Sequence, residues 1–458
     1  MTNSLFDGDF DECPADSCRR WMKSLQILVI SQYWYPENGV PQRRWGWLAE
    51  ILKEQGHSVT VVAPPAHYDR RMSFPRWVKA RGFLPRKESE TGPSGERIVR
   101  SGFFPGGTSL TIRAFNQAAV ALGSLQVLLA AGGSLKGYRP DLIFGTVPAL
   151  PTSAVTWLAS KRFQAPYVID LRDAWPDLLK EADSWNEGTG KKSFRQRVLS
   201  VGLFQIVSWL TQRVLYRSMR EADAIISTSS ELAKDLRQRA VLIRNGATPL
   251  VFTIRNVFPA ATKFKTNRNL ATSGTLRVLY AGTIGRAQDL QNAVDALKLC
   301  IQQGVDVRLR FVGSGAAKPE LQRISKDLGS AVSFEPKHPA DSLEEYYQWA
   351  DTALVHLADW EPLKRTVPSK VYELMEAGIH ISAVVQGEAA SIIAGLNAGT
   401  VVRPNDPKAL AELWTQLVWN PKGLEVSDSG ASWVKQQRSH ETPRTVSKII
   451  STVVRRSE

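Results

Sequence analysis

The chain has 458 residues, of which 43% are hydrophobic and 22% are charged. This length allows two or three domains, and the composition is that of a globular protein, which excludes a largely disordered chain. The 58 Lys and Arg residues exceed the 44 Asp and Glu residues, and the net charge of +14 favours anionic partners such as nucleotides, anionic lipids or nucleic acids. Cys13, Cys18 and Cys300 form no metal-ligand spacing and fit a reducing compartment.

The sequence predicts neither a secretory signal nor a membrane-spanning helix. Residues 1–24 contain many acidic side chains and no apolar core, so we expect a disordered tail there. The longest apolar run, residues 118–132, is interrupted by polar residues and is too short to cross a bilayer. We therefore expect a soluble or membrane-surface protein.

Residues 25–250 alternate short β-branched segments with amphipathic ones. Strands are predicted at residues 26–31, 58–63, 141–145, 167–171 and 224–227, and helices at residues 42–55, 109–131, 151–163 and 194–220. Nearly continuous apolar strands separated by helices predict a parallel sheet with both faces covered. The predicted fold class is therefore α/β, and this part should form a doubly wound, Rossmann-like domain.

The polar segment at residues 251–275 is predicted to be a linker, after which the alternation restarts. Residues 276–435 contain predicted strands at 276–281, 307–312, 332–334, 352–356, 381–385 and 400–402, with helices between them. Residues 436–458 are amphipathic, and we expect a helix that packs back on the first domain. Two doubly wound domains should then face each other across a cleft, with ligands at the carboxyl ends of the strands.

The segment after the predicted strand 352–356 has the features of a nucleotide-binding helix start. Pro368 and Ser369 suit a first helical turn, whose unpaired amides and positive dipole end favour a phosphate. Lys370 adds a cation, and Glu373 shares its helix face, where a carboxylate can accept hydrogen bonds from two ribose hydroxyls. An ordinary capped amphipathic helix with a solvated Glu373 explains the segment equally well.

Glycines follow the first two predicted strands of the second domain. Gly282 and Gly285 leave space for a diphosphate, which Arg286 could neutralise. Gly313 and Gly315 precede a helix and form a second candidate anion site. Each glycine pair alone is weak evidence, but their shared position at the carboxyl ends of strands favours a phosphate ligand.

Two loops of the first domain carry candidate residues for contact with a ligand. Residues 32–41 include Glu37 and Gly39, and Gly39 can adopt a positive φ that lets an amide approach a ligand, although a simple turn glycine is the favoured interpretation. Arg172 and Asp173 leave the fourth predicted strand at its carboxyl end. There a charged pair could contact a reacting group, or order the loop as an internal ion pair.

Basic and aromatic residues are interleaved between Arg70 and Arg100, around Phe74 and Trp77, which predicts contact with an anionic membrane surface. A second basic stretch contains Lys191, Lys192, Arg195 and Arg197. A solvated basic face is the simpler alternative. Nucleic-acid binding is another, but the sequence has no helix-turn-helix, zinc-finger or RRM signature, so we expect no specific nucleic-acid partner.

The pair Asp7 and Asp9 has the spacing of a metal-binding motif, but it precedes the first strand in the charged tail. We therefore expect no metal there, and no other Asp, Glu or His cluster in the sequence suggests one.

Together these motifs resemble those of retaining glycosyltransferases with the GT-B fold, in glycosyltransferase family 4. Within it they resemble the bacterial group that transfers N-acetylfucosamine-type sugars in O-antigen and capsule assembly. The matching blocks cover most of residues 25–435 in order: 32–39, 56–62, 140–143, 170–176, 243–246, 280–290, 313–315, 368–370, 373–378 and 401–407.

The resemblance implies transfer of a sugar, with retained configuration, from a nucleotide-diphosphate donor to a glycan or lipid-linked acceptor. It favours a UDP-linked donor, implies no cofactor or metal, and suggests a cytoplasmic protein, peripheral on the inner face of the cytoplasmic membrane. The donor would lie on the second domain, with Glu373 at the ribose, and with Lys370 and residues 282–288, Gln288 among them, beside the diphosphate. Arg172 and Asp173 are then the candidate catalytic residues.

The chain departs from the family pattern at three places. Arg365 stands where many members have the first of two glutamates, and Thr283 and Gln288 replace an Arg and a Lys of the glycine-rich loop. Arg365, Arg286 and Lys370 could restore the positive charge. The family's usual histidine near the fourth strand is replaced by the Arg172–Asp173 corner. These departures leave open a relative that binds a nucleotide sugar without transferring it, or a sugar-nucleotide epimerase.

Overall fold

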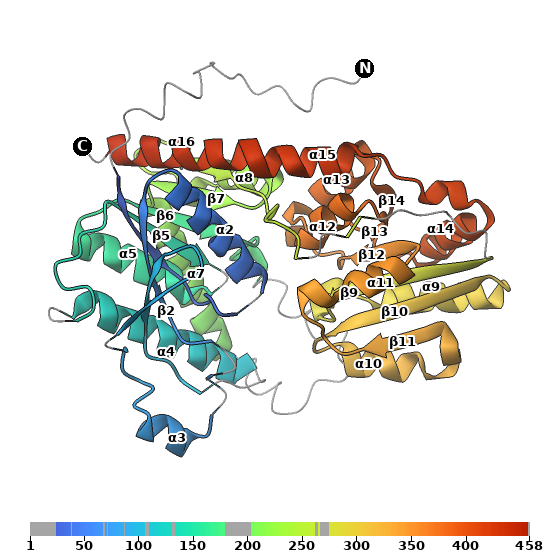
Figure 1. Cartoon of the computed structure of the whole chain (residues 1–458), viewed down its shortest axis with the longest axis horizontal. Coiled ribbons are helices and arrows are strands. Elements are labelled where there is room, and N and C mark those ends of the chain that lie inside the picture. Colours follow the sequence, from blue (N-terminus) through green and yellow to red (C-terminus); the bar gives the residue numbers. More distant parts are fainter. Residues whose placement is uncertain are drawn as a thin grey trace.

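The computed structural model describes residues 24–456 except for residues 38, 67–68, 71, 87, 106–109, 131–132, 148, 179–202, 262–263 and 266–273. The tail up to residue 23, with Asp7 and Asp9, and the basic stretch at residues 191–197 therefore lie outside the described residues. The rest forms two α/β domains that lie side by side (Figure 1), which confirms the predicted fold class.

Eight strands form the sheet of the first domain, in the order β3-β4-β2-β1-β5-β6-β7-β8. Their bounds are β1 Gln26–Ile30, β2 Ser58–Ala63, β3 Ser89–Thr91, β4 Arg97–Arg100, β5 Leu142–Val147, β6 Tyr167–Leu171, β7 Ala224–Ser227 and β8 Val251–Thr253. All neighbours are parallel except β3 and β4. The short strands β3, β4 and β8 were not predicted, and β8 carries this sheet past residue 250, where the linker was expected to begin.

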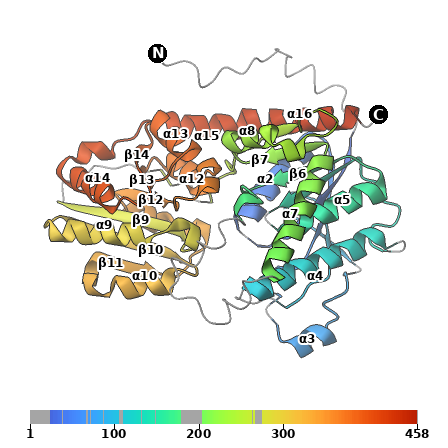
Figure 2. The same cartoon turned by 180° about the vertical axis from the view of Figure 1, so that it is seen from behind.

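Helices cover both faces of this sheet. The helices of this domain are α2 Val40–Glu54, α3 Phe74–Lys79, α4 Leu110–Leu129, α5 Pro151–Phe163, α7 Leu203–Glu221 and α8 Ser230–Gln238. Helices α4, α5 and α7 pack together on the face seen in Figure 2. Helix α2 lies on the other face, where Trp45 and Leu48 enter the core. The fully buried Arg44 fixes α2 to the end of β6 through Asp170 and to the following chain through the Ile254 carbonyl.

Six parallel strands form the second sheet, in the order β11-β10-β9-β12-β13-β14. The strands are β9 Thr275–Thr283, β10 Asp306–Ser314, β11 Val332–Glu335, β12 Thr352–His356, β13 His380–Val384 and β14 Gly399–Val402. The helices are α9 Gln291–Gln302, α10 Lys318–Ile324, α11 Glu344–Trp349, α12 Ser369–Ala377, α13 Glu388–Gly395 and α14 Pro407–Trp419. The chain turns from one half of this sheet to the other between β9 and β12, and ligands of doubly wound sheets bind at such a switch point.

The last two helices, α15 Ser429–Gln436 and α16 Thr442–Arg455, run along one side of both domains (Figure 1). Helix α15 packs on α12 of the second domain, and α16 packs on α2 and β8 of the first. Arg438 lies between these two helices. Its guanidinium pairs with Glu376 at 2.6 Å and donates to the Val257 carbonyl at 2.6 Å. A single apolar core therefore continues from α2 through α16 to α12.

Candidate functional site

Helix α12 brings Lys370 and Glu373 together on one face. Lys370 Nζ donates to Glu373 Oε2 at 3.0 Å, and the Tyr347 hydroxyl of α11 donates to Glu373 Oε1 at 2.6 Å. Lys370 Nζ also donates to the Tyr347 hydroxyl at 2.9 Å. Only 11% of the Glu373 side chain and 24% of the Lys370 side chain are exposed. Glu373 is therefore not the solvated residue of an ordinary surface helix.

The electrostatics of this cluster keep Glu373 ionised. Burial acts to raise the pKa of Glu373, but the charge of Lys370 and the hydrogen bonds from Tyr347 and Lys370 outweigh burial and lower that pKa. Burial and the adjacent carboxylate raise the pKa of Tyr347 well above its usual value, so its hydroxyl stays a donor. A carboxylate held in this way can accept hydrogen bonds from ligand hydroxyls, which would release Lys370 for a phosphate.

Arg43 of α2 faces this cluster from the first domain. Burial lowers the pKa of Arg43, and the nearby charge of Glu373 opposes that effect. The Arg43 guanidinium lies over the Phe258 ring, 4.7 Å from its centroid, and donates to the Pro259 carbonyl at 2.6 Å. The Glu373 carboxylate is therefore turned toward the region between the two domains, where the cleft was predicted.

The loop after β9 combines an exposed glycine with an arginine nitrogen that lacks a hydrogen-bond partner among the described residues. In the 3-10 turn Arg286–Gln288, the Arg286 Nε atom is buried and has no hydrogen-bond partner among the described residues. Gln288 folds back over Gly285, where an added Cβ would lie 2.6 Å from Gln288 Oε1. Gly282 is exposed, and an added Cβ would meet nothing closer than the Tyr280 hydroxyl at 3.3 Å. An unpaired donor beside an open strand end suits an anion.

Gly313 and Gly315 have a packing role that the sequence did not reveal. A Cβ on Gly313 would lie 1.9 Å from the Gly282 carbonyl oxygen, and a Cβ on Gly315 would lie 1.9 Å from the Ile284 carbonyl oxygen. The amide of Ala317 donates to that same Ile284 carbonyl at 3.1 Å. These glycines therefore let the ends of β9 and β10 pack closely, which explains their presence without a second anion site.

Arg172 and Asp173 lie at the carboxyl end of β6, as expected. Arg172 is 7% exposed, and its Nε and Nη1 atoms are buried without a partner among the described residues. No carboxylate of the described residues lies within 4 Å of its guanidinium, so the alternative of an Arg172–Asp173 ion pair is wrong. Burial raises the pKa of Asp173, and the charge of Arg172 opposes this. The Arg172 carbonyl accepts a hydrogen bond from Thr228 at 2.8 Å.

The loop after β1 contains Glu37 and Gly39. Glu37 lies 3.6 Å from the buried Arg70 and accepts a hydrogen bond from Gln42. Gly39 precedes α2 with φ −94° and ψ 172°, an extended conformation, so it does not use the positive φ that a glycine permits. An added Cβ would lie 2.6 Å from Gln42 Oε1, but this atom ends a flexible side chain that can move away, so the contact alone does not require a glycine.

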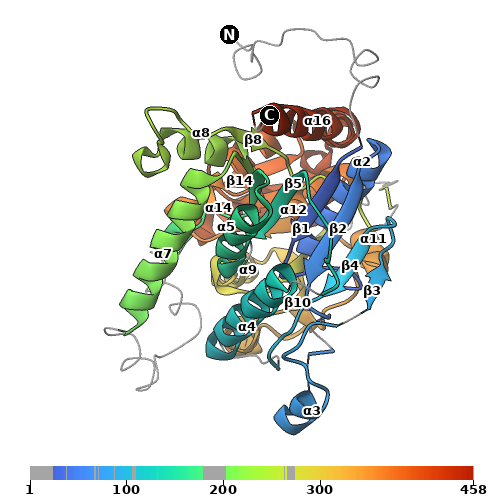
Figure 3. The same cartoon turned by 90° about the vertical axis from the view of Figure 1, so that its left-hand side faces the viewer.

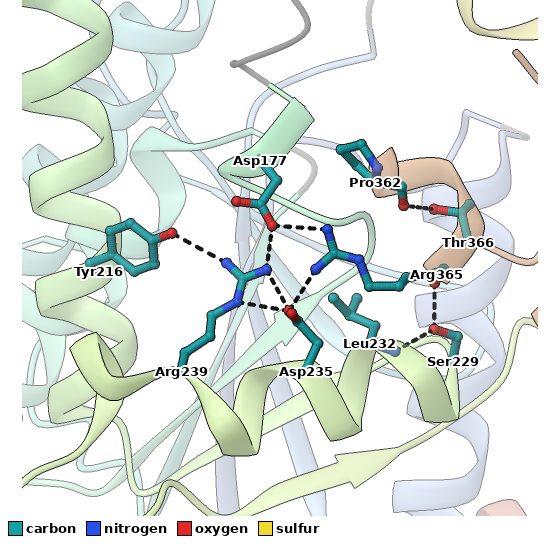
Figure 4. A network of polar contacts seen from close by, with 9 residues as sticks. All are labelled: Asp177, Tyr216, Ser229, Leu232, Asp235, Arg239, Pro362, Arg365 and Thr366. Atoms are coloured by element: carbon teal, nitrogen blue, oxygen red, sulfur yellow. Dashed lines mark hydrogen bonds and ion pairs between the residues drawn. The ribbon is translucent and has the colours of Figure 1, made fainter. Parts of the chain in front are cut away.

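Arg365 pairs with carboxylates of the first domain. It follows β12 in the 3-10 turn Glu361–Arg365 and joins an interdomain ion-pair network with Asp177, Asp235 and Arg239 of the first domain (Figure 4). Arg365 Nη2 lies 3.1 Å from Asp177 Oδ2, and Nη1 lies 2.6 Å from Asp235 Oδ2. The Ser229 hydroxyl donates to the Arg365 carbonyl at 2.5 Å. Asp177 and Asp235 pair with the Arg365 charge in the ligand-free structure, and a role of Arg365 at the diphosphate stays a prediction.

Sequence reasoning missed Tyr347, Arg43 and Asp177. Tyr347 is fully buried on α11 and Arg43 lies on α2, and neither belongs to a motif. Asp177 directly follows the Asp170–Pro176 block but was not part of it. These three residues come from elements other than α12, so only the fold shows which side chains they contact.

Two further features of the described residues concern metal binding and membrane spanning. In the described part of the chain, no group of three or more His, Cys, Asp or Glu side chains could hold a metal ion. No helix among the described residues is both long and apolar enough to cross a membrane.

The comparisons with known proteins agree with this geometry. Residues 39–248 match the model of the glycosyl transferase 4-like domain, and residues 275–420 match that of the glycosyl transferases group 1. An Escherichia coli K12 protein named for colanic acid biosynthesis, glycosyl transferase WcaI, is 22% identical over 414 residues, with 87% of this chain and 93% of that protein covered.

Solved structures with the same two-domain arrangement include two at 16% sequence identity. Sucrose-phosphate synthase of Thermosynechococcus elongatus superposes with a TM-score of 0.64, covering 94% of this chain and 98% of its own. HepE of Anabaena, in complex with UDP-glucose, superposes with a TM-score of 0.57, covering 94% and 99%. These likenesses show the GT-B fold.

Proposed function

Since the chain belongs to the retaining group 1 glycosyltransferases of family 4 and depends on a nucleotide sugar, we propose that it transfers a sugar from a UDP-linked donor to a lipid-linked glycan in surface polysaccharide assembly. The observation that carries the donor site is the buried Tyr347–Lys370–Glu373 cluster facing α2. The UDP-glucose bound to HepE and the colanic acid named for WcaI support the donor and the pathway class. The comparisons support no particular sugar, so the N-acetylfucosamine-type donor stays a prediction.

The proposed roles follow from charge and position. Glu373 accepts hydrogen bonds from the ribose, while Lys370 and Arg286 neutralise the diphosphate as negative charge develops on the leaving group. The bond between the anomeric carbon and the diphosphate oxygen breaks as the acceptor oxygen bonds to that carbon. Asp173 orients the acceptor hydroxyl, and positioning of this kind lowers the barrier. The proton passes to Asp173 or to a phosphate oxygen of the departing UDP.

Donor binding tests this proposal most directly. We expect Glu373→Gln and Lys370→Ala to weaken UDP binding, measured by calorimetry, by about tenfold or more, because each removes a charged hydrogen-bond partner. The matched control is Lys298→Ala, which breaks a comparable pair with Asp295 one helical turn apart on α9, 37% exposed on both sides. The control should leave UDP affinity unchanged.

The unfolding midpoint separates a binding role from a structural one. Glu373→Gln and Lys370→Ala should lower the midpoint of the ligand-free protein only slightly, while the UDP-induced rise in midpoint should shrink. If both variants unfold early and still bind UDP as tightly as the wild type, the cluster is structural and the donor site lies elsewhere.

A lipid-linked acceptor lies in a membrane, so the enzyme needs a surface that binds the membrane, and α3 offers such a surface. Helix α3 projects from the body of the first domain (Figure 3), and none of its residues is buried. Phe74, Val78 and Phe83 are 57%, 45% and 44% exposed. The exposed cations around them are Arg76, Lys79, Arg81 and Arg86. Apolar side chains among cations fit an interface with anionic headgroups.

Vesicle binding tests this surface. We expect the triple variant Phe74→Ser, Val78→Ser, Phe83→Ser to lose co-sedimentation with phosphatidylglycerol vesicles while its UDP affinity stays that of the wild type. Trp419→Ser on the second domain, 77% exposed in the wild type, is the control and should keep vesicle binding. Equal binding by the triple variant would show that α3 is only a solvated basic face.

A further inference from the structure

Arg172 is a buried cation that forms no ion pair within 4 Å among the described residues, although the charges of Asp170 and Asp173 act on it from farther away. Only 7% of the residue is exposed, yet neither Nε nor Nη1 has a hydrogen-bond partner among the described residues. Burying a charge without a partner is costly, and buried charges are normally paired. The arrangement therefore indicates that something absent from the free protein completes the site.

The nearest carboxylates do not supply this partner. Asp170 already accepts hydrogen bonds from Arg44 at 2.8 and 3.2 Å and from the Trp45 indole at 2.8 Å. The Arg44 charge therefore balances that of Asp170. Asp173, the next residue, makes no ion pair within 4 Å of Arg172. Burial also raises the pKa of Asp173, which disfavours its negatively charged form. The positive charge of Arg172 remains available.

The place of Arg172 in the fold points to the acceptor side. It leaves the carboxyl end of β6 in the first domain, whereas Lys370 and Arg286, the cations assigned to the donor diphosphate, both belong to the second domain. Tyr33, after β1, acts electrostatically on both Arg172 and the buried Arg70. Arg70 begins the segment that leads to α3, the surface proposed to contact the membrane. Arg172 and α3 thus lie on the same domain, opposite the donor.

We propose that Arg172 anchors a second anion-binding subsite, in the first domain, that holds an oxyanion of the acceptor, either a phosphoryl or a carboxylate group. This inference rests on the proposed function and adds the substrate class: the acceptor is anionic close to the hydroxyl that receives the sugar. Arginine suits this task because it is always charged and makes strong hydrogen bonds to such groups.

The test keeps the donor site occupied. Inorganic pyrophosphate is titrated by calorimetry into the protein saturated with UDP, so that binding reports on the second subsite, and glucuronate replaces pyrophosphate in a parallel titration. We expect the wild type to bind at least one of these anions. Arg172→Gln should weaken that binding by about tenfold or more, Arg172→Lys less. The exposed Arg323, paired with Glu320, supplies the control Arg323→Gln, which should bind like the wild type.

The two titrations also identify the source of the charge. Binding of pyrophosphate that depends on Arg172 indicates a phosphoryl acceptor, and binding of glucuronate that depends on it indicates a carboxylate acceptor. If neither anion binds in the presence of UDP, or if Arg172→Gln weakens UDP itself and leaves the second anion unaffected, the proposal is overturned.

Stability provides an independent readout. Because Arg172→Gln removes an unpaired buried charge, we expect the unfolding midpoint of the ligand-free variant to equal or exceed that of the wild type. A lower midpoint would mark Arg172 as a structural residue and count against the subsite. Failure of the wild type to bind UDP would instead contradict the proposed donor, while the anion titrations without UDP would still report on Arg172.

Discussion

His356, at the end of β12, is a residue whose charge state is set by its surroundings. It is 2% exposed, and its Nε2 atom lies 3.0 Å from Asn292 Nδ2. Burial lowers the pKa of His356 to about 3. The folded protein therefore keeps this imidazole neutral at pH values where the unfolded chain, with an ordinary pKa near 6.5, takes up a proton.

The sign of the pH effect follows from this difference. The unfolded state binds the extra proton between about pH 6.5 and pH 3, so the contribution of His356 to stability is lost as the pH falls through that window. At pH 5 we expect a loss of about 2 kcal/mol relative to pH 7.5. His356→Gln should lack this loss, so urea unfolding curves of the two proteins should converge on acidification. Parallel pH dependences would show that His356 titrates normally in the folded state.

Single residues also show what the sequence could predict about the site. Lys370 and Glu373 were predictable because three-residue spacing on a helix places two side chains on one face. Their burial was not predictable, since it depends on Tyr347, which comes from another helix. The ion pairs of Arg365 were not predictable for the same reason. Its sequence position suggested the donor, whereas its partners Asp177 and Asp235 lie in the other domain.

Among the elements, the central strands were predicted well and the short peripheral ones were missed. Strands such as β2, β6, β7 and β12 have the predicted bounds because strands buried on both faces are nearly continuous apolar runs. The strands β3 and β8 have three residues each and lie at the edges of the sheet. Three residues contain too little periodicity to separate a strand from a loop.

The close packing of β9 and β10 gives a prediction for Gly315. Gly315→Ala should destabilise the protein by about 1–3 kcal/mol in urea unfolding, because the new methyl group overlaps the Ile284 backbone, which cannot move away without shifting the strand end. The displaced β9 loop carries Arg286, so UDP affinity should fall as well.

Helix α13 provides the matched glycine control. Gly395 ends this helix, and an added Cβ would meet nothing within 4 Å. Gly395→Ala should therefore be neutral or stabilising by up to about 1 kcal/mol. If Gly315→Ala were as harmless as Gly395→Ala, the close approach of the two strand ends would not be a constraint on this chain.

Across the whole molecule, the two domains are joined along one side. Arg255 of the first domain pairs with Glu388 at the start of α13, and Glu388 also accepts from the Ser230 and Glu231 amides at 3.0 and 2.8 Å. Arg438 adds the contact between α12 and the segment that follows β8. In Figure 1 the helices α8, α13, α15 and α16 lie along this same edge of the molecule. Motion of one domain against the other would therefore pivot about this edge.

The interdomain ion-pair network lies within this joined region and tests how the domains cooperate. Arg365 is 16% exposed and connects the segment before α12 with Asp177, seven residues after Asp170 and close to the Arg172–Asp173 corner. Arg365→Gln removes both ion pairs to the first domain but no residue of the donor cluster. We expect the turnover of sugar transfer to fall several-fold while UDP affinity stays within about twofold of the wild type, since the proposed UDP site uses the second domain alone.

A double-mutant cycle with Asp235→Asn should give a coupling between the two positions of about 0.5–3 kcal/mol, because the side chains share one network. Arg323→Gln, an exposed pair outside the interface, should change neither turnover nor UDP affinity. A loss of UDP affinity in Arg365→Gln as large as in Lys370→Ala would mean that the Arg365 charge acts on the diphosphate. Arg365 would then contact the donor diphosphate in the UDP-bound protein, and its ion pairs to Asp177 and Asp235 would be limited to the ligand-free state.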